Sequence, residues 1–312
     1  MLTPRSLPRI ATAPYFFQPL QILKRLRLEY LWRSKNEAMV TLPWGLPIKI
    51  NPHEAVGHDI ASQGLYEIEV TETLWRLTER GDLAIDAGAN IGYTTSILGV
   101  RVGPTGRVHS FEPHPQVFES LRDNVEVWKR DHRCGSFILH QTALGMENGK
   151  ALLHTNDWFR TNRGTAWISE KVEDGPPDLR VIEVPIRSLD SILSEDVTIG
   201  VLKMDVQGHE LGILRGMARL LQRRAVRDIV FEEEAAFPAP THEYLKAYGY
   251  TVLGLQGFFA GVHAVPDAQP VFDPKFGSVP NYLATRDAER ARARLRPGLW
   301  RSFGPGRLLV SR

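Results

Sequence analysis

From residue 83 onward, short apolar segments alternate with segments of helical length, and this alternation constrains the fold more than any other feature. We expect strands at Leu83–Asp86, Arg107–Phe111, Phe137–Leu144, Val201–Met204 and Asp228–Phe231, with helices at Ile91–Val100, Val117–Trp128, Glu210–Leu221 and Glu243–Tyr248. Strands that alternate with such helices are typical of βαβ units and of a parallel sheet covered on both faces. The sequence therefore predicts an α/β fold with a doubly wound sheet.

Three further regions surround this pattern. Between Gly145 and Leu202 the alternation is broken by β-rich pieces, best interpreted as a hairpin insertion: Ala151–Thr155, Thr165–Ser169 and Val181–Ile186. Upstream we expect an N-terminal extension, with a helix at Gln18–Ser34 and a hairpin at Val40–Ile50, then a helix around Tyr66–Thr78; downstream, a surface helix at Asp287–Leu295. The predicted organisation is a basic extension at 1–40, one domain at 41–285 with its core at about 80–255, and an arginine-rich tail at 286–312.

Charge is segregated along the chain, although the formal net charge of the 312 residues is only +2. Residues 1–40 carry seven basic and two acidic side chains, and residues 286–312 carry eight arginines and two acidic side chains. Residues 41–285 between these ends, the body of the chain, are acidic overall. The ligand of this central part can therefore differ from the partner that the basic ends contact. The basic ends could rest on an anionic membrane surface, or the first helix could pack on the domain behind it.

The chain has one cysteine, Cys134, which excludes an internal disulfide, a CxxC redox pair and a cysteine-rich zinc site. A reduced compartment and a half-buried thiol are expected. No apolar run reaches the roughly 18 residues of a spanning helix. Prolines interrupt the first 14 residues, where a leader peptide needs an unbroken apolar stretch. We therefore expect a cytoplasmic protein, whose oligomeric state the sequence leaves open.

Ligands of doubly wound sheets bind at the carboxyl ends of the strands, so residues after each strand are the first candidates for function. The first strand leads into D-x-G-x-N-x-G, where Gly88 and Gly92 permit a tight turn and close approach of the backbone to a ligand. The dinucleotide fingerprint G-x-G-x-x-G is absent. Asp86 would repel a pyrophosphate and attract a ligand that carries a cation.

The second strand ends at Glu112, 26 residues after Asp86. An acidic side chain at this tip can accept hydrogen bonds from both hydroxyls of a ribose. An adenosine cofactor with a positive charge and no phosphate fits both carboxylates, and S-adenosylmethionine has these properties. For each residue alone, a helix cap or a surface carboxylate is an adequate explanation; for the pair at this spacing it is not.

Six sequence blocks carry a more specific signal, in order over roughly residues 40–235: Gly64–Glu67 (GLYE), Ile85–Tyr93 (IDAGANIGY), Val108–Pro115 (VHSFEPHP), Thr142–Gly145 (TALG), Ser188–Asp190 (SLD) and Val201–Leu211 (VLKMDVQGHEL). Together they resemble the FkbM family of S-adenosylmethionine-dependent methyltransferases. The resemblance implies a Rossmann-like class I methyltransferase domain. It also implies transfer of methyl to a hydroxyl of a sugar, glycolipid or polyketide-type small molecule.

The resemblance further implies where the cofactor binds. Its contacts would be Asp86, Gly88, Asn90, Gly92 and Glu112, with Thr142 and Ala143 near the adenine and Tyr66 and Glu67 closing over the amino-acid end.

One block departs from the family pattern, because D-x-E-G-H-E reads here as Asp205-Val206-Gln207-Gly208-His209-Glu210. Gln207 keeps hydrogen-bonding ability but cannot take up a proton. The candidates for the base that accepts the hydroxyl proton are then Asp205 at the strand tip and His209 at the helix start. The alternative is structural: Asp205 as a helix N-cap and His209 as a packed residue of the first turn.

Two charged residues near this block have open roles. Lys203 points to the same side of its strand as Asp205 and could hold it ionised, or serve as a structural salt bridge. Glu232 ends the next strand, and with Asp205 it could bind a divalent cation, although solvated acids explain it as well. The sequence therefore predicts no metal.

Three other functions compete with this interpretation. A nucleic-acid methyltransferase is suggested by the basic ends, but the body is acidic where a phosphate backbone would run. A binding protein that has lost activity is suggested by Gln207, and a nicotinamide oxidoreductase is disfavoured by the missing fingerprint. The acceptor would be held by inserted loops, which carry Trp158, Phe159, Arg160, Asn162, Arg163, Phe258 and Phe259.

Overall fold

The structure is a computed structural model, and it describes residues 37–156, 159, 162, 166–169, 179–235, 237–258, 261–266, 279–296, 298 and 300–303. The expected helix at Gln18–Ser34, most of the loop at 157–165 and the end of the tail lie outside these residues. Among the helices of the described part, none has the length and apolar character that a bilayer span requires.

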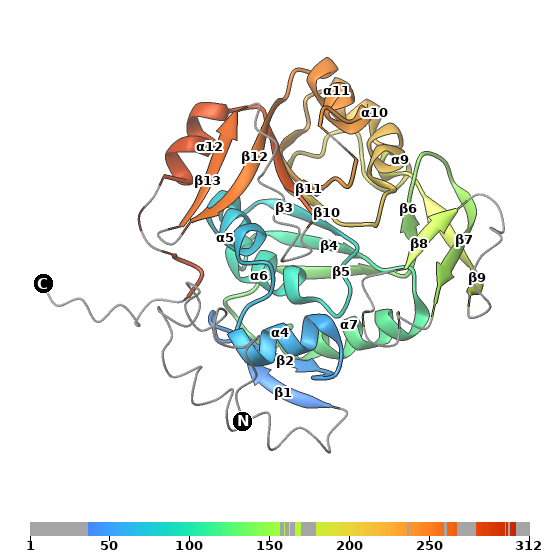
Figure 1. Cartoon of the computed structure of the whole chain (residues 1–312), viewed down its shortest axis with the longest axis vertical. Coiled ribbons are helices and arrows are strands. Elements are labelled where there is room, and N and C mark those ends of the chain that lie inside the picture. Colours follow the sequence, from blue (N-terminus) through green and yellow to red (C-terminus); the bar gives the residue numbers. More distant parts are fainter. Residues whose placement is uncertain are drawn as a thin grey trace, which may run out of the picture.

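A mixed sheet runs through the molecule, and its described strands follow the order β13-β12-β14-β11-β10-β3-β4-β5 (Figure 1). The five neighbouring strands from β11 to the edge strand β5 pair in parallel, which confirms the doubly wound Rossmann-like prediction. They are β3 (Leu83–Ala87), β4 (Arg107–Phe111), β5 (Ser136–His140), β10 (Ile199–Met204) and β11 (Val226–Glu232).

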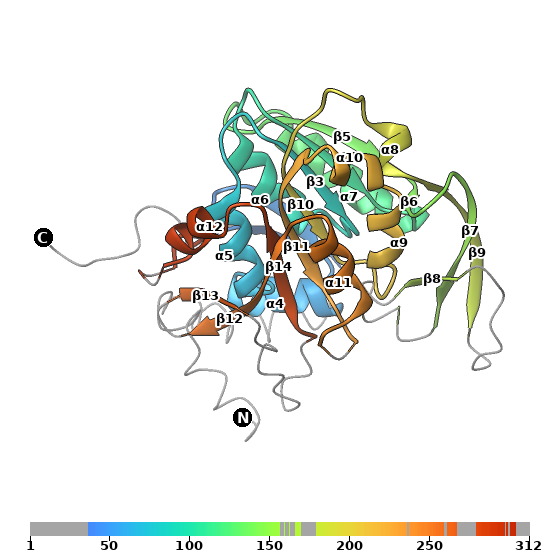
Figure 2. The ribbon, with the colours of Figure 1, turned by 90° about the horizontal axis from the view of Figure 1, so that it is seen from above.

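Helices cover both faces of this sheet, as Figure 2 shows. Strand β10 is largely apolar because both of its faces are buried. Val201 packs into the core on one face of the sheet, and Leu202 and Met204 pack into the core on the other. On the first face lie α4 (Ala55–Gln63), α5 (Ile68–Leu77), α6 (Tyr93–Val102) and α7 (Pro115–Trp128). On the second lie α8 (Leu189–Ile192), α9 (Glu210–Arg215), α10 (Ala218–Gln222) and α11 (Pro240–Ala247).

The sheet differs from the expected parallel one at one edge. Strand β14 (Asn281–Thr285) is inserted antiparallel between β11 and β12 (Thr251–Phe258), and β13 (Gly261–Pro266) pairs antiparallel with β12. The sequence analysis did not predict these three strands. β12 and β13 form a hairpin at the edge of the sheet, and β14 follows a long connection, so no alternation of strands and helices indicates them.

The expected helix at Glu210–Leu221 is divided into α9 and α10 around Gly216. A Cβ at Gly216 would lie 1.9 Å from the carbonyl oxygen of Gly145, so the backbones of two segments meet here. The expected strand at Phe137–Leu144 is likewise divided, because β6 (Ala143–Leu144) leaves the central sheet and pairs with β9 (Arg180–Arg187).

The insertion is a second sheet rather than a single hairpin. Its described strands follow the order β6-β9-β7-β8, with β7 (Gly149–Thr155) antiparallel to both β9 and β8 (Trp167–Ser169). This sheet projects beside the carboxyl end of the central sheet in both views (Figures 1 and 2). The sequence identified the three longer strands but not β6, whose two residues are too few to show a period.

The hairpin and the C-terminal helix of the sequence analysis are both confirmed. Strands β1 (Ala38–Thr41) and β2 (Pro47–Ile50) pair antiparallel, and the indole nitrogen of Trp128 donates to the carbonyl of Pro47 at 2.5 Å. Helix α12 (Ala288–Arg294) begins after Asp287, whose carboxylate accepts the amide of Arg290 as an N-cap. The predicted half-buried thiol of Cys134 is buried.

A buried ion pair on α5 holds the C-terminal segment. Glu72 is 0% exposed, and it accepts from the guanidinium of Arg76 and from the amide of Ser302. Arg76 in turn donates to the carbonyls of Arg294 and Arg296 at 2.9 and 3.0 Å. Glu72→Ala would leave Arg76 buried without its counter-charge, so we expect a loss of about 3–5 kcal/mol in the free energy of unfolding by urea.

The matched control for Glu72→Ala is Glu126→Ala, which breaks an i,i+3 pair with Lys129 whose two side chains are 59% and 46% exposed. Surface pairs contribute little, so the urea midpoint of this variant is expected to match that of the unaltered protein. Equal midpoints for the two variants would show that the ion pair of α5 does not hold the C-terminal segment.

Candidate functional site

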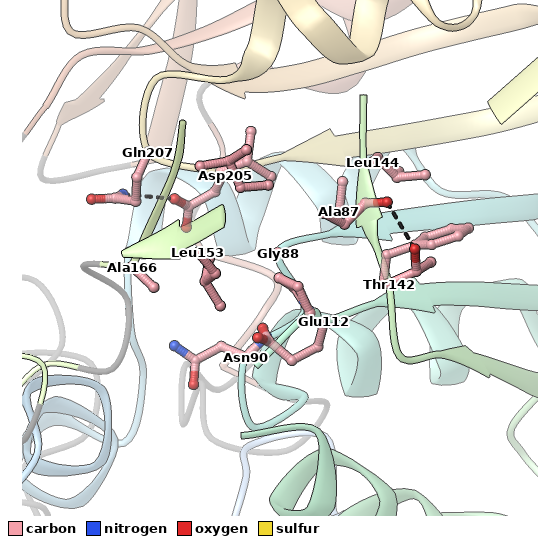
Figure 3. A pocket seen from close by; sticks show the side chains of 15 residues that line it. Ala87, Gly88, Asn90, Glu112, Thr142, Leu144, Leu153, Ala166, Asp205 and Gln207 are labelled. Carbon is pink, nitrogen blue, oxygen red and sulfur yellow. Dashed lines mark hydrogen bonds between the residues drawn. The ribbon is translucent and has the colours of Figure 1, made fainter. Parts of the chain in front are cut away.

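A cavity of about 600 Å³, including the part open to solvent, lies at the carboxyl ends of β3, β4 and β10. Figure 3 shows how side chains from distant segments converge on it: Asn90 and Glu112 on one side, Asp205 and Gln207 on another, and Thr142 on a third. Leu153, Ala166 and Ile168 of the insertion sheet and its loop add an apolar wall. The cavity thus occupies the strand-tip position expected for a doubly wound sheet.

The turn after β3 brings the backbone close to the tip of β10. Gly88 has φ +76°, and a Cβ there would lie 1.9 Å from the carbonyl oxygen of Asp205. The amides of Gly88 and Ala89 both donate to the carbonyl of Phe111, at 3.1 and 2.9 Å. Only glycine fits this crossing, because it combines a left-handed conformation with absence of a side chain. Gly88 lines the cavity at the tip of β3, where the sequence analysis expected a tight turn.

Glu112 is held in one orientation at the mouth of the cavity. Its side chain accepts the amide of Asn90 at 3.0 Å and the amide of His114 at 2.9 Å. Burial raises the pKa of Glu112 to about 7, against the effect of these two hydrogen bonds. Each carboxylate oxygen retains acceptor capacity for a hydroxyl group of a ligand.

Asp86 lies beneath the cavity rather than on its wall. Its side chain is 0% exposed, accepts from the hydroxyl of Thr95 at 2.6 Å and stands 3.8 Å from the ammonium of Lys203. Burial raises the pKa of Asp86, and Lys203 opposes that effect. Side chains alternate along β3, and Asp86 faces α6 beneath the turn, so it contributes charge from below.

Gly92 also points away from the cavity. A Cβ at Gly92 would lie 2.8 Å from a methyl carbon of Leu121, so this glycine allows α6 to pack against α7. Thr142 and Ala143 do line the cavity. The hydroxyl of Thr142 donates to the carbonyl of Pro185 at 2.9 Å, which joins the strand tips to the insertion sheet.

Asp205, the residue after β10, is the carboxylate of this strand tip that reaches the cavity. Its side chain is 24% exposed, and Lys203 donates to it at 3.3 Å. Burial opposes its ionisation, but Lys203 and the hydrogen bond from Gln207 outweigh burial and lower its pKa. Lys203 itself is 5% exposed and also donates to the carbonyl of Gly88 at 3.3 Å. It therefore ties the turn after β3 to the tip of β10.

Tyr66 and Glu67 immediately precede α5 and lie beside this charged group rather than on the cavity wall. The amide of Tyr66 donates to the hydroxyl of Tyr93 at 3.1 Å, and Glu67 has φ +40°. Burial, followed by the charge of Asp205, raises the pKa of Glu67 to about 7. The structure thus places Glu67 close to Asp205.

His209 is the N-cap residue of α9, and its ring packs against glycine instead of entering the cavity. A Cβ at Gly212 would lie 2.6 Å from Nε2 of His209, and one at Gly145 would lie 3.1 Å from the same atom. Of the two candidate bases, the structure brings Asp205 to the cavity and leaves His209 off its lining.

The predicted acceptor loops are only partly described. Trp158, Arg160, Arg163 and Phe259 lie outside the described residues. The ring of Phe159 packs on that of His114, with centroids 4.6 Å apart, so the insertion reaches the turn that follows Glu112. In the part of the chain that the structure describes, no group of three or more histidine, cysteine or acidic side chains could hold a metal ion.

Sequence reasoning missed the apolar wall of the insertion and left Gln207 without a positive role. The apolar residues Ala151–Leu153 of β7 indicate a strand, but no local pattern indicates that Leu153 meets the strand tips of the central sheet. The amide of Gln207 donates to Asp205 and to Glu232 of the neighbouring strand β11, and no local sequence pattern reveals such a contact.

The chain matches the model of the methyltransferase FkbM domain over residues 86–252. It is 28% identical over 148 residues to "Methyltransferase 1" of Beauveria bassiana, covering 43% of this chain and 57% of that protein. It is 29% identical over 158 residues to "Hexuronic acid methyltransferase AglP" of Haloferax volcanii, covering 50% and 58% respectively. The match thus spans less than two thirds of either relative.

Among solved structures, the chain is similar to methyltransferase FkbM from Methylobacillus flagellatus KT. The two are 19% identical with a TM-score of 0.38, and the match covers 65% of this chain and 43% of that one.

Proposed function

We propose that this chain, which belongs to the FkbM methyltransferase family, transfers a methyl group from S-adenosylmethionine to a hydroxyl oxygen of a sugar-like acceptor. One observation carries the proposal: Glu112, the Gly88 turn and Asp205 meet in one cavity at the strand tips. The relative from Haloferax volcanii named for hexuronic acid methylation supports a sugar acceptor.

The residues of the cavity fit this cofactor. Glu112 would accept the ribose hydroxyls, the Gly88 turn would let the protein backbone approach the ligand closely, and Thr142 and Ala143 would border the adenine. Asp86 and Glu67 would place two further carboxyl groups close by; burial raises the pKa of both, and a bound ammonium or sulfonium would favour their ionised forms. When bound, S-adenosylmethionine supplies an electrophilic methyl group.

The protein's own contribution is to orient the acceptor and to take its proton. Asp205 is partly exposed in the cavity, and Lys203 favours its ionised form. A carboxylate within hydrogen-bond reach of the hydroxyl can accept the proton as the oxygen attacks. The apolar wall of the insertion sheet would exclude water and help to align the acceptor with the methyl group.

The first test is isothermal calorimetry with S-adenosylmethionine, followed by mass spectrometry of glycans and lipids incubated with cofactor, with and without the protein. We expect micromolar affinity and a mass increase of one methylene in the glycan or glycolipid pool. Absence of cofactor binding would overturn the enzyme proposal. Binding without any methylated product in either pool would overturn the assignment of a hydroxyl acceptor of this class.

The role of Glu112 predicts how cofactor affinity depends on pH. Its pKa is raised to about 7, so the carboxylate is the dominant form at pH 8 and a minor one at pH 6. If the ribose hydroxyls bind the ionised form, the Kd for S-adenosylmethionine should be about tenfold higher at pH 6 than at pH 8.

The control is Glu112→Gln, which keeps the shape of the side chain and cannot titrate. We expect weaker binding of the cofactor, with this component of the pH dependence removed. An identical pH dependence in both proteins would assign the titration to another group, such as Glu67.

A further inference from the structure

Gln207 joins the tips of two neighbouring strands. Its side-chain amide nitrogen donates to Oδ1 of Asp205 at 3.1 Å and to Oε2 of Glu232 at 3.2 Å. Asp205 follows β10 and Glu232 ends β11, and the two strands pair in parallel with Met204 opposite Phe231. Both N–H groups of one amide are therefore directed at two carboxyl groups on different strands.

The backbone of Gln207 supports this arrangement. Its φ is +55°, in the left-handed region that non-glycine residues adopt infrequently. Gly208 follows with φ +92°, so the chain reverses at this point and turns the side chain of Gln207 back toward the strand tips. A conformation with a local cost is expected where the surrounding contacts require it.

The charged groups that face the pair come from β10, β3, the residues before α5, and α9, whose first residue Glu210 interacts with the charge of Asp205. Lys203 of β10 donates to Asp205, and Asp86 of β3 lies 3.8 Å from Lys203. Glu67, at the start of α5, and its neighbour Tyr66 are close enough to act on the charges of both Asp205 and Glu232. Lys203 is thus the single cation in this described group, set against several carboxyl groups that cannot all be ionised at low cost.

We propose that Gln207 is a positioning residue that holds Asp205 and Glu232 as a pair with one proton, in which Asp205 is the carboxylate and Glu232 the carboxylic acid. The inference rests on the proposed function in one respect, namely that Asp205 is the group that takes the hydroxyl proton. The protonation pattern itself does not depend on which acceptor is methylated.

Three features assign the proton to Glu232. Both carboxyl groups accept from Gln207, but Asp205 also receives a hydrogen bond from the ammonium of Lys203, which favours its charge. Burial, followed by the charges of Asp205 and Glu67, raises the pKa of Glu232 to about 10. Lys203 and the bond from Gln207 lower the pKa of Asp205 despite its burial.

In the transfer step, the acceptor's O–H bond breaks and its proton passes to Asp205. The oxygen forms a bond to the methyl carbon as the carbon–sulfur bond breaks, and that electron pair stays on sulfur, which loses its positive charge. Asp205 then returns the proton to solvent through its exposed edge, which is 24% of the side chain. Glu232 keeps its own proton throughout, so the pair begins each cycle with one proton.

An amide suits this position better than a carboxylate. It donates to both members of the pair and adds no charge, whereas a glutamate at 207 would be a third acidic group in contact with the other two. Gln207→Glu should therefore raise the pKa of Asp205 by like-charge repulsion. The uncharged Gln207→Leu removes both donors and should raise it by a smaller amount.

The test is carboxyl ¹³C NMR of the full chain labelled at its aspartate and glutamate carboxyl carbons. Spectra are recorded with and without S-adenosylhomocysteine, and the resonances are assigned from Asp205→Asn and Glu232→Gln. At pH 7 we expect the chemical shift of a carboxylate for Asp205 and that of a carboxylic acid for Glu232. In Gln207→Glu, the titration midpoint of Asp205 should rise by at least about one pH unit. The matched control is Gln222→Glu, which adds the same charge at the exposed last residue of α10 and should shift neither resonance.

Kinetics with the acceptor found by profiling supply a second measurement. In Gln207→Leu we expect kcat to fall at least about tenfold while the KM for S-adenosylmethionine changes less than threefold.

Carboxylate chemical shifts for both Asp205 and Glu232 at pH 7, or an unchanged titration midpoint of Asp205 in Gln207→Glu, would overturn the inference. If Gln207→Glu does not fold, the charge states of Asp205 and Glu232 in the unaltered protein and in Gln207→Leu test the inference instead. Failure to bind S-adenosylhomocysteine would instead overturn the proposed function, since the charge states can be read without it.

Discussion

Asp205→Asn should reduce kcat for methyl transfer by about 100- to 10,000-fold, the range in which a general base contributes to a reaction. The amide keeps the shape of the side chain and removes its ability to accept a proton. Asp205 is the carboxylate that lines the cavity from β10, and His209, the other candidate, does not line it. The measurement is transfer of radiolabelled methyl from S-adenosylmethionine to the acceptor identified by profiling.

Two controls make this result specific. The Kd for the cofactor, measured by calorimetry, should stay within about threefold, because Asp205 acts on the acceptor and not on the ribose. Asp123→Asn makes the same chemical change on the exposed face of α7 and should leave kcat unchanged. A fall in kcat of less than tenfold for Asp205→Asn would show that another group takes the proton, and His209→Gln would then be the next variant to measure.

Gly88→Ala should abolish cofactor binding at accessible concentrations, a loss of more than about 100-fold in affinity. The new methyl group would stand 1.9 Å from the carbonyl oxygen of Asp205, which is backbone and cannot rotate away. The turn after β3 and the tip of β10 would have to separate, and residues of both segments line the cavity. We also expect a loss of about 1–3 kcal/mol in the free energy of unfolding from overpacking. Calorimetry and urea unfolding measure the two effects.

Gly249→Ala is the control that distinguishes the steric clash expected in Gly88→Ala from the cost of a left-handed backbone conformation. Gly249 has φ +82°, close to the +76° of Gly88, but a Cβ there meets nothing within 4 Å. This variant should lose about 1 kcal/mol of stability from the left-handed conformation and bind the cofactor normally. If Gly88→Ala also bound the cofactor normally, the turn would be free to move and would not shape the site.

Much of the candidate site followed from sequence patterns because a parallel sheet places all its strand tips at one edge. Glu112 and Asp205 each directly follow a strand that the sequence predicted, and the structure brings both to the cavity. Glycine at position 88 indicated a tight turn, which the positive φ confirms. The family match over residues 86–252 confirms the resemblance on which the cofactor interpretation depended.

Other parts could not be predicted, since they depend on contacts between segments far apart in the chain. Asp86 has the residue type and spacing of a ligand contact, yet the pleat of β3 turns it toward Thr95 and Lys203. His209 has suitable chemistry for a base, but its ring occupies the space left by Gly145 and Gly212. A local pattern reports that a side chain is buried and does not report which remote neighbour it meets.

The sequence by itself determined the alternation of the five parallel strands with helices, the position of the strand tips and the family, because apolar periodicity and short motifs are properties of contiguous residues. Only the tertiary structure decided that β14 inserts antiparallel beside β11, that the insertion forms a wall of the cavity, and that Gln207 links Asp205 to Glu232. The physical reason is register: which side chains share a space is fixed by how strands align across the sheet, and that alignment is set by packing of the whole chain.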